Sequence, residues 1–203
     1  MNSPDTKQNI TCIIIDDEQE ACDRLECLLE KIPTVNKIVT ETDAEKGIEW
    51  IINNSFDLVF LDVEMPKKNG FEVVREIRNK NLAPTFIFVT AYAQYAIKAI
   101  RNTAFDYLLK PVDIDELKEA INRFQYNREK AFKDNLPAKL KREYSLTDRE
   151  IEIVIMLGEG KTSANISEQL FISKNTVDTH RRNILEKTHT KNTPDLIAHI
   201  TTF

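Results

Sequence analysis

The chain has 203 residues, of which 41% are hydrophobic, and its formal net charge is −5. This length allows one large domain or two modest ones, and the apolar content excludes a chain that is disordered throughout. No apolar run approaches the roughly 20 residues of a membrane-spanning helix. The first residues, MNSPDTKQNI, lack the basic start and the apolar stretch of a signal peptide. We therefore expect a cytoplasmic protein that makes no contact with a membrane.

In the first part of the chain, short apolar runs rich in β-forming residues alternate with amphipathic helical segments. The expected strands are 12–16, 36–41, 56–62, 85–90 and 105–110. The expected helices are 18–31, 43–54, 70–80, 93–102 and 113–127. Nearly continuous apolar strands separated by helices indicate βαβ units, in which a parallel sheet is covered on both faces. Five such units predict a doubly wound α/β fold, for which we expect the strand order 2-1-3-4-5.

The pattern then changes. The stretch 129–143 is charged, lacks a clear period and contains Pro137, so we interpret it as a linker between the domains 1–128 and 144–203. Beyond the linker only helical patterns occur. The first of these helices begins at the capping box Thr147–Glu150. The others are 163–171, 174–188 and a fourth from about residue 192. The second domain is therefore predicted to be all-α, with four helices.

Acidic side chains stand at the ends of two expected strands. Asp16 and Asp17 end the first strand, and Asp62 ends the third. With the order 2-1-3-4-5 these strands are neighbours at the switch point, where doubly wound sheets bind their ligands. Three carboxylates so close together raise one another's pKa unless a cation lies among them. Oxygen ligands of this kind suit Mg²⁺, so the sequence predicts a magnesium site at this edge of the sheet.

The ends of the fourth and fifth strands add a hydroxyl, Thr90, and an ammonium, Lys110. An anionic group bonded to Asp62 would therefore meet a metal ion, a hydroxyl and a cation. These groups suit phosphoryl transfer onto a carboxylate, because catalysis of that reaction is mostly charge neutralisation and positioning. We therefore expect Asp62 to accept a phosphoryl group.

The motifs IIIDDE, LDVEMPKKNG, VTAY and DYLLKP follow one another in this order. With them, residues 10–128 closely resemble the receiver domain of bacterial two-component response regulators, whose fold is flavodoxin-like. The resemblance implies that Asp62 is the phosphoacceptor. It also implies that Mg²⁺ is bound by Asp16, Asp17, Asp62 and the backbone carbonyl of Glu64.

The resemblance assigns further roles around this pocket. Thr90 and Lys110 would contact the phosphoryl group, and Tyr107 would swing inward when Thr90 is drawn toward it. Glu64 and Tyr92 lie two residues after the acceptor and two after Thr90. Side chains at these positions can obstruct or orient the attacking water, so we expect them to tune how long the phosphoryl group survives.

A second class of protein uses the same covalent chemistry. The tripeptide Asp62-Val63-Glu64 superficially resembles the Asp-x-Asp nucleophile motif of phosphatases that form an aspartyl phosphate. Such enzymes need a second aspartate as the general acid, normally after the first strand of their core. Here the second acid is one methylene longer and the motif follows the third strand. Turnover of a generic phosphomonoester discriminates the two classes, and a receiver domain should show negligible turnover.

The segment TAYAQYAIKAIRNTAFDYLLKPVD resembles receivers that are usually joined to a β-rich DNA-binding domain of the LytTR type. The tail of this chain is helical, so its role must be inferred from its own residues. Residues 146–200 resemble the LuxR-type helix-turn-helix. The matching positions are Leu146, Thr147, Arg149, Glu150, Gly160, Ile166, Ile172, Ser173, Thr176, Val177, Thr179 and His180.

The expected helix 174–188 has two different faces. One face carries Val177, Ile184 and Thr188, and the opposite face carries Asn175, Thr179, Arg182 and Glu186. The first face can pack on the preceding helix while the second enters a major groove. By resemblance, the base-reading residues are Asp178, Thr179 and Arg182. The phosphate-contacting residues are Thr162, Lys174, Thr176 and Arg181.

Two of these residues would prefer a particular base, and a third differs from the residue that the family often has at its position. Arg182 would favour guanine, and Thr179 would meet a thymine methyl group. The family often has a basic residue at the position of Asp178. An aspartate that faces DNA repels phosphates unless it accepts a hydrogen bond from cytosine N4. We therefore predict weak non-specific binding with a shallow salt dependence.

The charge distribution limits where a nucleic acid could bind. Residues 1–130 carry 17 basic against 23 acidic residues, and residues 131–203 carry 11 against 10. Within the second part, 174–191 holds five basic and two acidic residues. The alternative is a signalling module whose helical tail binds protein instead of DNA. A salt-dependent gel shift with and without acetyl phosphate discriminates the two.

Together these features predict a two-component transcriptional regulator. A partner histidine kinase passes a phosphoryl group to Asp62, and the face of the receiver from strand four to helix five rearranges. The tail then forms a homodimer through the helix 192–202 and binds double-stranded DNA with two-fold symmetry. Such a chain is not an enzyme toward other substrates. It accepts its own phosphoryl group and loses it slowly by hydrolysis.

Overall fold

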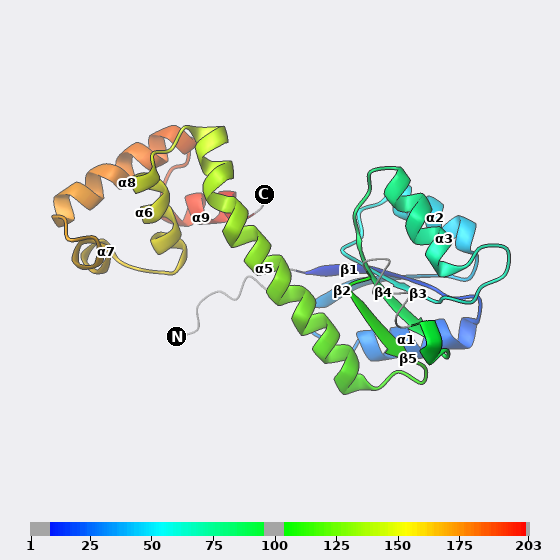
Figure 1. The fold of residues 1–203 in the computed structure, drawn as a ribbon. Helices are drawn as coiled ribbons and strands as arrows, with labels where there is room; N and C mark the ends of the chain where they lie inside the picture. The colour runs from blue at the N-terminus through cyan, green and yellow to red at the C-terminus, as the bar shows by residue number, and fades with distance from the viewer. Residues whose placement is uncertain (1–8, 96–103, 202–203) are drawn as a thin grey trace. The chain divides into compact units, whose positions relative to one another are not determined.

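The computed structural model describes residues 9–95 and 104–201 and divides the chain into two units, Met1–Gln125 and Tyr126–Phe203 (Figure 1). Within the described residues, no helix combines the length and the apolar character that crossing a bilayer requires. Each unit has its own hydrophobic core.

The first unit contains a five-stranded sheet, all of whose strands are parallel. The strands are β1 (Ile10–Ile15), β2 (Val35–Glu41), β3 (Leu58–Leu61), β4 (Thr85–Thr90) and β5 (Asp106–Leu109). Their order is β2-β1-β3-β4-β5. The predicted doubly wound fold and its strand order are therefore confirmed.

Helices cover both faces of this sheet (Figure 1). They are α1 (Gln19–Leu29), α2 (Ala44–Asn53), α3 (Gly70–Asn79) and α5 (Ile114–Tyr144), and a short 3₁₀ helix, η1, spans Ala93–Tyr95. The predicted helix 93–102 lies mostly outside the described residues. Successive side chains of a strand point to opposite faces. Accordingly, Ile14 of β1 packs with α1 and α5, while its neighbours Ile13 and Ile15 pack with α2 and α3.

Helix α5 is 31 residues long and contains the whole segment 129–143, which the sequence pattern suggested to be a linker. Its first part packs on the sheet through Leu117 and Ile121. Its last part packs into the core of the second unit through Leu136 and Leu140, which are four residues apart and so share one face of the helix. The segment is therefore helical, and part of it belongs to the second core.

The second unit is all-α within the residues described. After the end of α5 it contains α6 (Asp148–Gly158), α7 (Ser163–Leu170), α8 (Lys174–Thr188) and α9 (Thr193–Thr201), in agreement with the four predicted helices. The capping box Thr147–Glu150 forms as expected, and Ser173 caps α8. Phe171 and His189 end α7 and α8 in the left-handed conformation. The buried Val177 and Ile184 hold α8 in the core.

Candidate functional site

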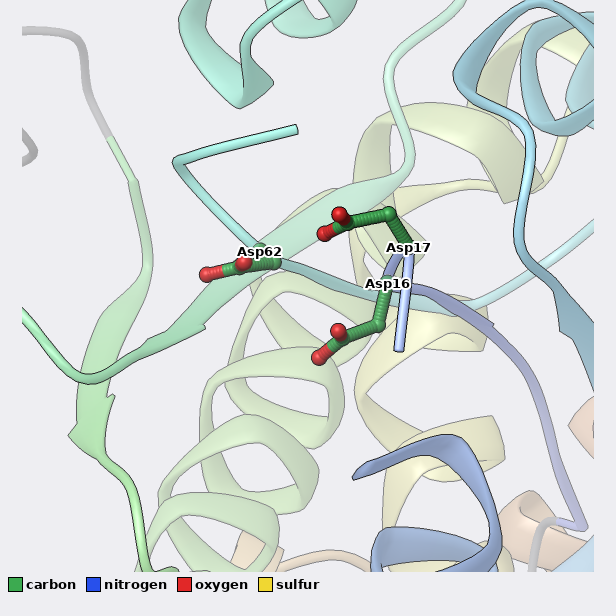
Figure 2. Close-up of side chains that lie close together, drawn as sticks. All are labelled: Asp16, Asp17 and Asp62. Carbon is green, nitrogen blue, oxygen red and sulfur yellow. The ribbon is translucent and has the colours of Figure 1, made fainter. Parts of the chain in front are cut away.

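Three aspartates meet at the carboxyl ends of two neighbouring strands. Asp16 and Asp17 follow β1, and Asp62 follows β3, whose last residue pairs with the last residue of β1. One carboxylate oxygen from each lies within 4.8 Å of the others. Figure 2 shows the three groups turned to the same side of the strand ends. Asp16 and Asp62 are buried, with 3% and 6% of their surface exposed, whereas Asp17 is exposed.

Each buried carboxylate has one oxygen anchored by the backbone. Asp16 Oδ1 accepts a hydrogen bond from the Glu18 amide at 3.1 Å, and Asp62 Oδ1 accepts one from the Val63 amide at 2.8 Å. The other oxygens face Lys110, whose Nζ lies 2.6 Å from Asp16 Oδ2 and 3.6 Å from Asp62 Oδ2. Both carboxylates are therefore fixed, with the second oxygen of each turned toward Lys110.

The ionisation of these groups is a balance between burial and pairing. Burial raises the pKa of Asp16 and of Asp62, although Lys110 works in the opposite direction. Burial alone would lower the pKa of Lys110, but the hydrogen bond and charge of Asp16 raise it above its usual value. The single positive charge of Lys110 therefore neutralises only part of the negative charge of Asp16 and Asp62. An oxygen-only donor set with excess negative charge fits a hard divalent cation such as Mg²⁺.

The backbone at the start of α3 lies very close to the backbone of Asp62. Gly70, the first residue of α3, donates its amide to the Val63 carbonyl at 3.0 Å. A Cβ atom added at Gly70 would lie 2.3 Å from the backbone oxygen of Asp62, closer than any side chain tolerates. Glycine is therefore required where α3 begins against the end of β3.

Two predicted switch residues stand on the adjoining strands. Thr90 ends β4 and is fully buried, and its hydroxyl has no hydrogen-bond partner among the described residues. That hydroxyl faces Asp62 and is among the groups that lower the pKa of its carboxyl, although no hydrogen bond of ordinary geometry joins the two. Tyr107 of β5 donates its hydroxyl to the backbone carbonyl of Tyr92. An orphan buried hydroxyl beside Asp62 is suited to receive a new acceptor there.

The side chain of Glu64 is not directed at the aspartates. Its Oε1 atom accepts a hydrogen bond from the hydroxyl of Tyr95, the last residue of η1. The ring of Tyr95 also meets the ring of Tyr92 edge-on, with centroids 6.1 Å apart. Tyr95 therefore touches both positions expected to tune the phosphoryl lifetime. The sequence does not predict this contact, because an aromatic residue in a connecting segment carries no local signal of its partners.

A cavity of about 490 Å³ opens beside the pocket. Asp16 and Lys110 line it together with Leu25 and Leu28 of α1 and with Pro111, which follows β5. Asp16 and Lys110 are therefore accessible from this cavity.

The helix-turn-helix of the second unit exposes only some of the predicted DNA-binding residues. Five are exposed, namely Thr162, Lys174, Thr176, Thr179 and Arg182. Asp178 and Arg181 are half-buried. The Asp178 carboxylate accepts a hydrogen bond from Ser163 at 2.7 Å, and Arg181 donates to Ser163 and, at 2.8 Å, to Thr193. The structure thus brings these two side chains to α7 and α9.

Comparison with known proteins agrees with this organisation. The family model of the response regulator receiver domain matches residues 12–122, more than half of the chain. This chain belongs to the response regulators. The family model of bacterial regulatory proteins of the luxR family matches residues 144–200. The predicted combination of a receiver domain with a LuxR-type domain is therefore confirmed.

Individual relatives match mainly over part of their length. The sensory transduction protein LytT of Bacillus anthracis is 35% identical over 118 residues, which are 58% of this chain and 48% of that protein. This response regulator spans about half the length of the curated relatives it matches. Similarity to LytT agrees with the LytTR-associated character of the receiver sequence.

Solved structures share the fold. The response regulator protein TrrA of Thermotoga maritima, solved in complex with Mg²⁺-BeF, is 31% identical; the match covers 57% of this chain and 98% of that one, with a TM-score of 0.52. Full-length FixJ of B. japonicum is 23% identical and has a TM-score of 0.53, and the match covers 95% of this chain and 96% of that one. At this identity the likeness to FixJ concerns the fold.

Proposed function

We propose that this response regulator belongs to a two-component system in which phosphorylation of Asp62 controls binding of the C-terminal domain to double-stranded DNA. The observation that carries the proposal is the state of the Asp62 carboxylate. It is buried, one oxygen is anchored by the Val63 amide, and the other lies 3.6 Å from the Lys110 ammonium. A carboxylate held in this way is oriented for attack on an electrophile whose negative charge the neighbouring cation neutralises.

The donor is a phosphohistidine of a partner histidine kinase. An oxygen of Asp62 attacks the phosphorus atom, so that a P–O bond forms while the P–N bond of the donor breaks and the imidazole leaves. The Lys110 ammonium neutralises one phosphoryl oxygen, and the Thr90 hydroxyl, which has no partner among the described residues, donates to another. Thr90 is thereby drawn toward Asp62, and space opens for Tyr107 to move inward.

A magnesium ion is the cofactor that the donor set fits. Asp16, Asp17, Asp62 and the backbone carbonyl of Glu64 would hold it. When bound, it supplies positive charge to the phosphoryl oxygens during transfer. The chain's own contribution is to keep the two buried carboxylates fixed through the Glu18 and Val63 amides.

The phosphorylated state ends by slow hydrolysis of the aspartyl phosphate, and the chain turns over no separate substrate. Glu64 and Tyr92 flank the acceptor and tune the access of water. A generic phosphomonoester tests this statement against the phosphatase alternative. Release of phosphate from it at a rate above that of the Asp62→Asn variant would favour a phosphatase.

The output is DNA binding in the cytoplasm by a homodimer that forms on phosphorylation through α9. Thr179 and Arg182 are exposed on one side of α8 and read base edges, while Thr162, Lys174 and Thr176 contact phosphates. The last three lie at the amino-terminal ends of α7 and α8, where a helix favours anions. Two-fold symmetry of the dimer predicts an operator with two related half-sites.

A gel shift on the promoter region of the protein's own gene tests the proposal. The full chain is assayed over a range of salt concentrations, with and without acetyl phosphate and Mg²⁺, beside an Asp62→Ala variant. We expect acetyl phosphate to lower the protein concentration needed for the shift in the wild type and to have no effect on the variant. Absence of binding to any DNA in either state would favour a tail that binds protein.

A further inference from the structure

Four polar side chains from three helices of the C-terminal unit form one cluster, here called the recognition-helix cluster. Ser163 is the first residue of α7 and is 5% exposed. Asp178 and Arg181 lie one turn apart on α8, and both are half-buried. Thr193 is the first residue of α9. The cluster therefore joins α8 to the helices on either side of it in the sequence.

The hydrogen bonds of the cluster form a connected chain. The Ser163 hydroxyl donates to Asp178 Oδ1 at 2.7 Å and accepts a hydrogen bond from Nη1 of Arg181. Nη2 of Arg181 donates to Thr193 Oγ1 at 2.8 Å, and Nη1 lies 4.0 Å from Asp178 Oδ1. The buried Ser163 hydroxyl thus has both a donor and an acceptor partner. Removal of Asp178 would leave it without its acceptor, which is unfavourable for a buried hydroxyl.

Helix geometry separates this cluster from the exposed residues of α8. Asp178 and Arg181 are spaced i, i+3, and so are Thr179 and Arg182, one position further on. One position turns the helix by about 100°. The first pair faces Ser163 and Thr193, whereas the second pair is exposed. The two rows can therefore serve different purposes, with one fixing the helix and the other facing a partner.

We propose that Asp178 is a positioning residue of α8 and not a base-reading residue, and that Thr179 and Arg182 carry the readout. This inference rests on the proposed DNA-binding function. It departs from the assignment by resemblance, in which Asp178 faces a base and Arg181 a phosphate. It also accounts for an acidic residue on a helix that enters DNA, because the charge of Asp178 is matched by Arg181 within the domain.

The Ser163→Ala variant separates the two roles of Asp178. Ser163 is buried and cannot read a base, yet it is the residue to which Asp178 is hydrogen-bonded. The full-length wild type, phosphorylated with acetyl phosphate, is first used to select a duplex from a random pool. The selected duplex and its single-base-pair variants are then titrated with wild type, Asp178→Ala, Ser163→Ala and the double variant. Thr179→Ala is the matched control, because Thr179 is exposed and lies next to Asp178.

We expect Asp178→Ala and Ser163→Ala each to lower the thermal midpoint of the C-terminal unit by about 4–8 °C. Each should weaken binding to the selected duplex and to all of its variants by the same factor, about tenfold. The double variant should lose little more than either single variant, because both remove the same link. Thr179→Ala should leave the midpoint unchanged and relax the preference at one base pair.

The opposite result would overturn the inference. If Asp178→Ala relaxes the preference at one base pair while Ser163→Ala relaxes none, the carboxylate reads that base. Failure of the proposed function gives a different result. In that case the phosphorylated wild type selects no duplex at all, and the role in recognition falls together with the function.

Discussion

Tyr95 links Glu64 and Tyr92, the two positions that the resemblance associates with the lifetime of the phosphoryl group. Its hydroxyl donates to Glu64 Oε1, and its ring lies edge-on to the ring of Tyr92. The hydrogen bond to Glu64 raises the pKa of Tyr95, so the hydroxyl stays protonated and remains a donor at neutral pH. The Glu64 carboxylate is therefore held by a partner other than the attacking water.

The substitution Tyr95→Phe keeps the ring and removes only the hydroxyl. We expect it to shorten the lifetime of the aspartyl phosphate severalfold, because the released Glu64 carboxylate can accept a proton from the water that attacks phosphorus. Decay of the phosphorylated chain after removal of acetyl phosphate measures this. In a Glu64→Ala background the same substitution should change nothing. An equal effect in both backgrounds would mean that Tyr95 acts by another route.

Glu150 is a buried acid whose carboxylate is paired with a lysine and accepts two hydrogen bonds. It is 3% exposed, its Oε2 lies 2.7 Å from Nζ of Lys187, and it also accepts hydrogen bonds from the amide and the hydroxyl of Thr147. Burial alone would raise the pKa of Glu150, but Lys187 and Thr147 outweigh it and hold the pKa below its usual 4.5. The ionised form is therefore the one that stabilises the contact between α6 and α8.

A Glu150→Gln substitution should lower the free energy of unfolding of the C-terminal unit by about 2 kcal/mol at neutral pH. The reason is that Lys187 loses its ionic partner and keeps only the Ser145 carbonyl at 3.3 Å. A group with a lowered folded pKa stabilises the fold above its unfolded pKa, and that stability is lost as the pH falls through the folded value. The difference between wild type and variant should thus shrink below pH 4.5. Urea unfolding at several pH values measures it. The pair Arg149–Glu152, whose carboxylate is exposed, is the control, and Glu152→Gln should cost less than about 1 kcal/mol.

At the level of helices and strands, the elements that local signals define were predictable. The apolar runs gave the strand ends that carry Asp16, Asp62 and Thr90, and the order of the strands then placed these residues together. Helix α8 has the predicted bounds, because Ser173 caps one end and the chain turns into the left-handed conformation at His189 on the other. Capping and periodicity are properties of neighbouring residues, so a single sequence contains them.

The elements that depend on distant contacts were not predictable. Helix α5 continues through 129–143 because Leu136 and Leu140 are buried by another part of the chain, while the charged residues around them hide the period and Pro137 suggests a break. The same holds for side chains. The bond between Ser163 and Asp178 joins two helices, and local sequence does not specify how helices pack.

In the turn between α7 and α8, one residue, Phe171, has a backbone conformation that is unfavourable for its type. Phe171 has a φ angle of 54°, in the left-handed region, and its side chain is 94% exposed. Glycine is the usual residue where a helix ends in this conformation, because it has no Cβ atom to crowd the backbone. The ring thus contributes little packing within the unit to offset this strain.

We expect Phe171→Gly to raise the free energy of unfolding of the C-terminal unit by about 1 kcal/mol, because it relieves the left-handed strain without loss of buried surface. Denaturant unfolding of the full chain measures the change. Phe171→Ala is the matched control, since it removes the ring but keeps the Cβ atom. An equal gain in both variants would attribute the effect to the exposed ring and not to the backbone.

For the molecule as a whole, the negative net charge opposes binding to DNA, which is itself negatively charged. The net charge is −5, and the basic residues of 174–191 are few. Two of these five are engaged inside the unit, since Arg181 bonds to Ser163 and Thr193, and Lys187 pairs with Glu150. The other three basic side chains of this stretch are Lys174, Arg182 and Lys191, all exposed. The cationic surface that 174–191 offers to DNA is therefore small. Under the proposed function, base contacts and the pairing of two subunits would contribute more to binding than charge.

The salt dependence of binding measures this surface. Each phosphate neutralised by the protein contributes about −0.9 to the slope of log affinity against log salt concentration. We expect Lys174→Met to make the slope shallower by about 0.9 for each subunit bound, with a similar loss on every sequence. Lys141→Met is the control, because Lys141 lies on α5 and its ammonium is paired with Asp148 at 2.8 Å. Titrations of the phosphorylated chain at several salt concentrations separate the two variants. An unchanged slope for Lys174→Met would mean that Lys174, at the amino-terminal end of α8, contacts no phosphate.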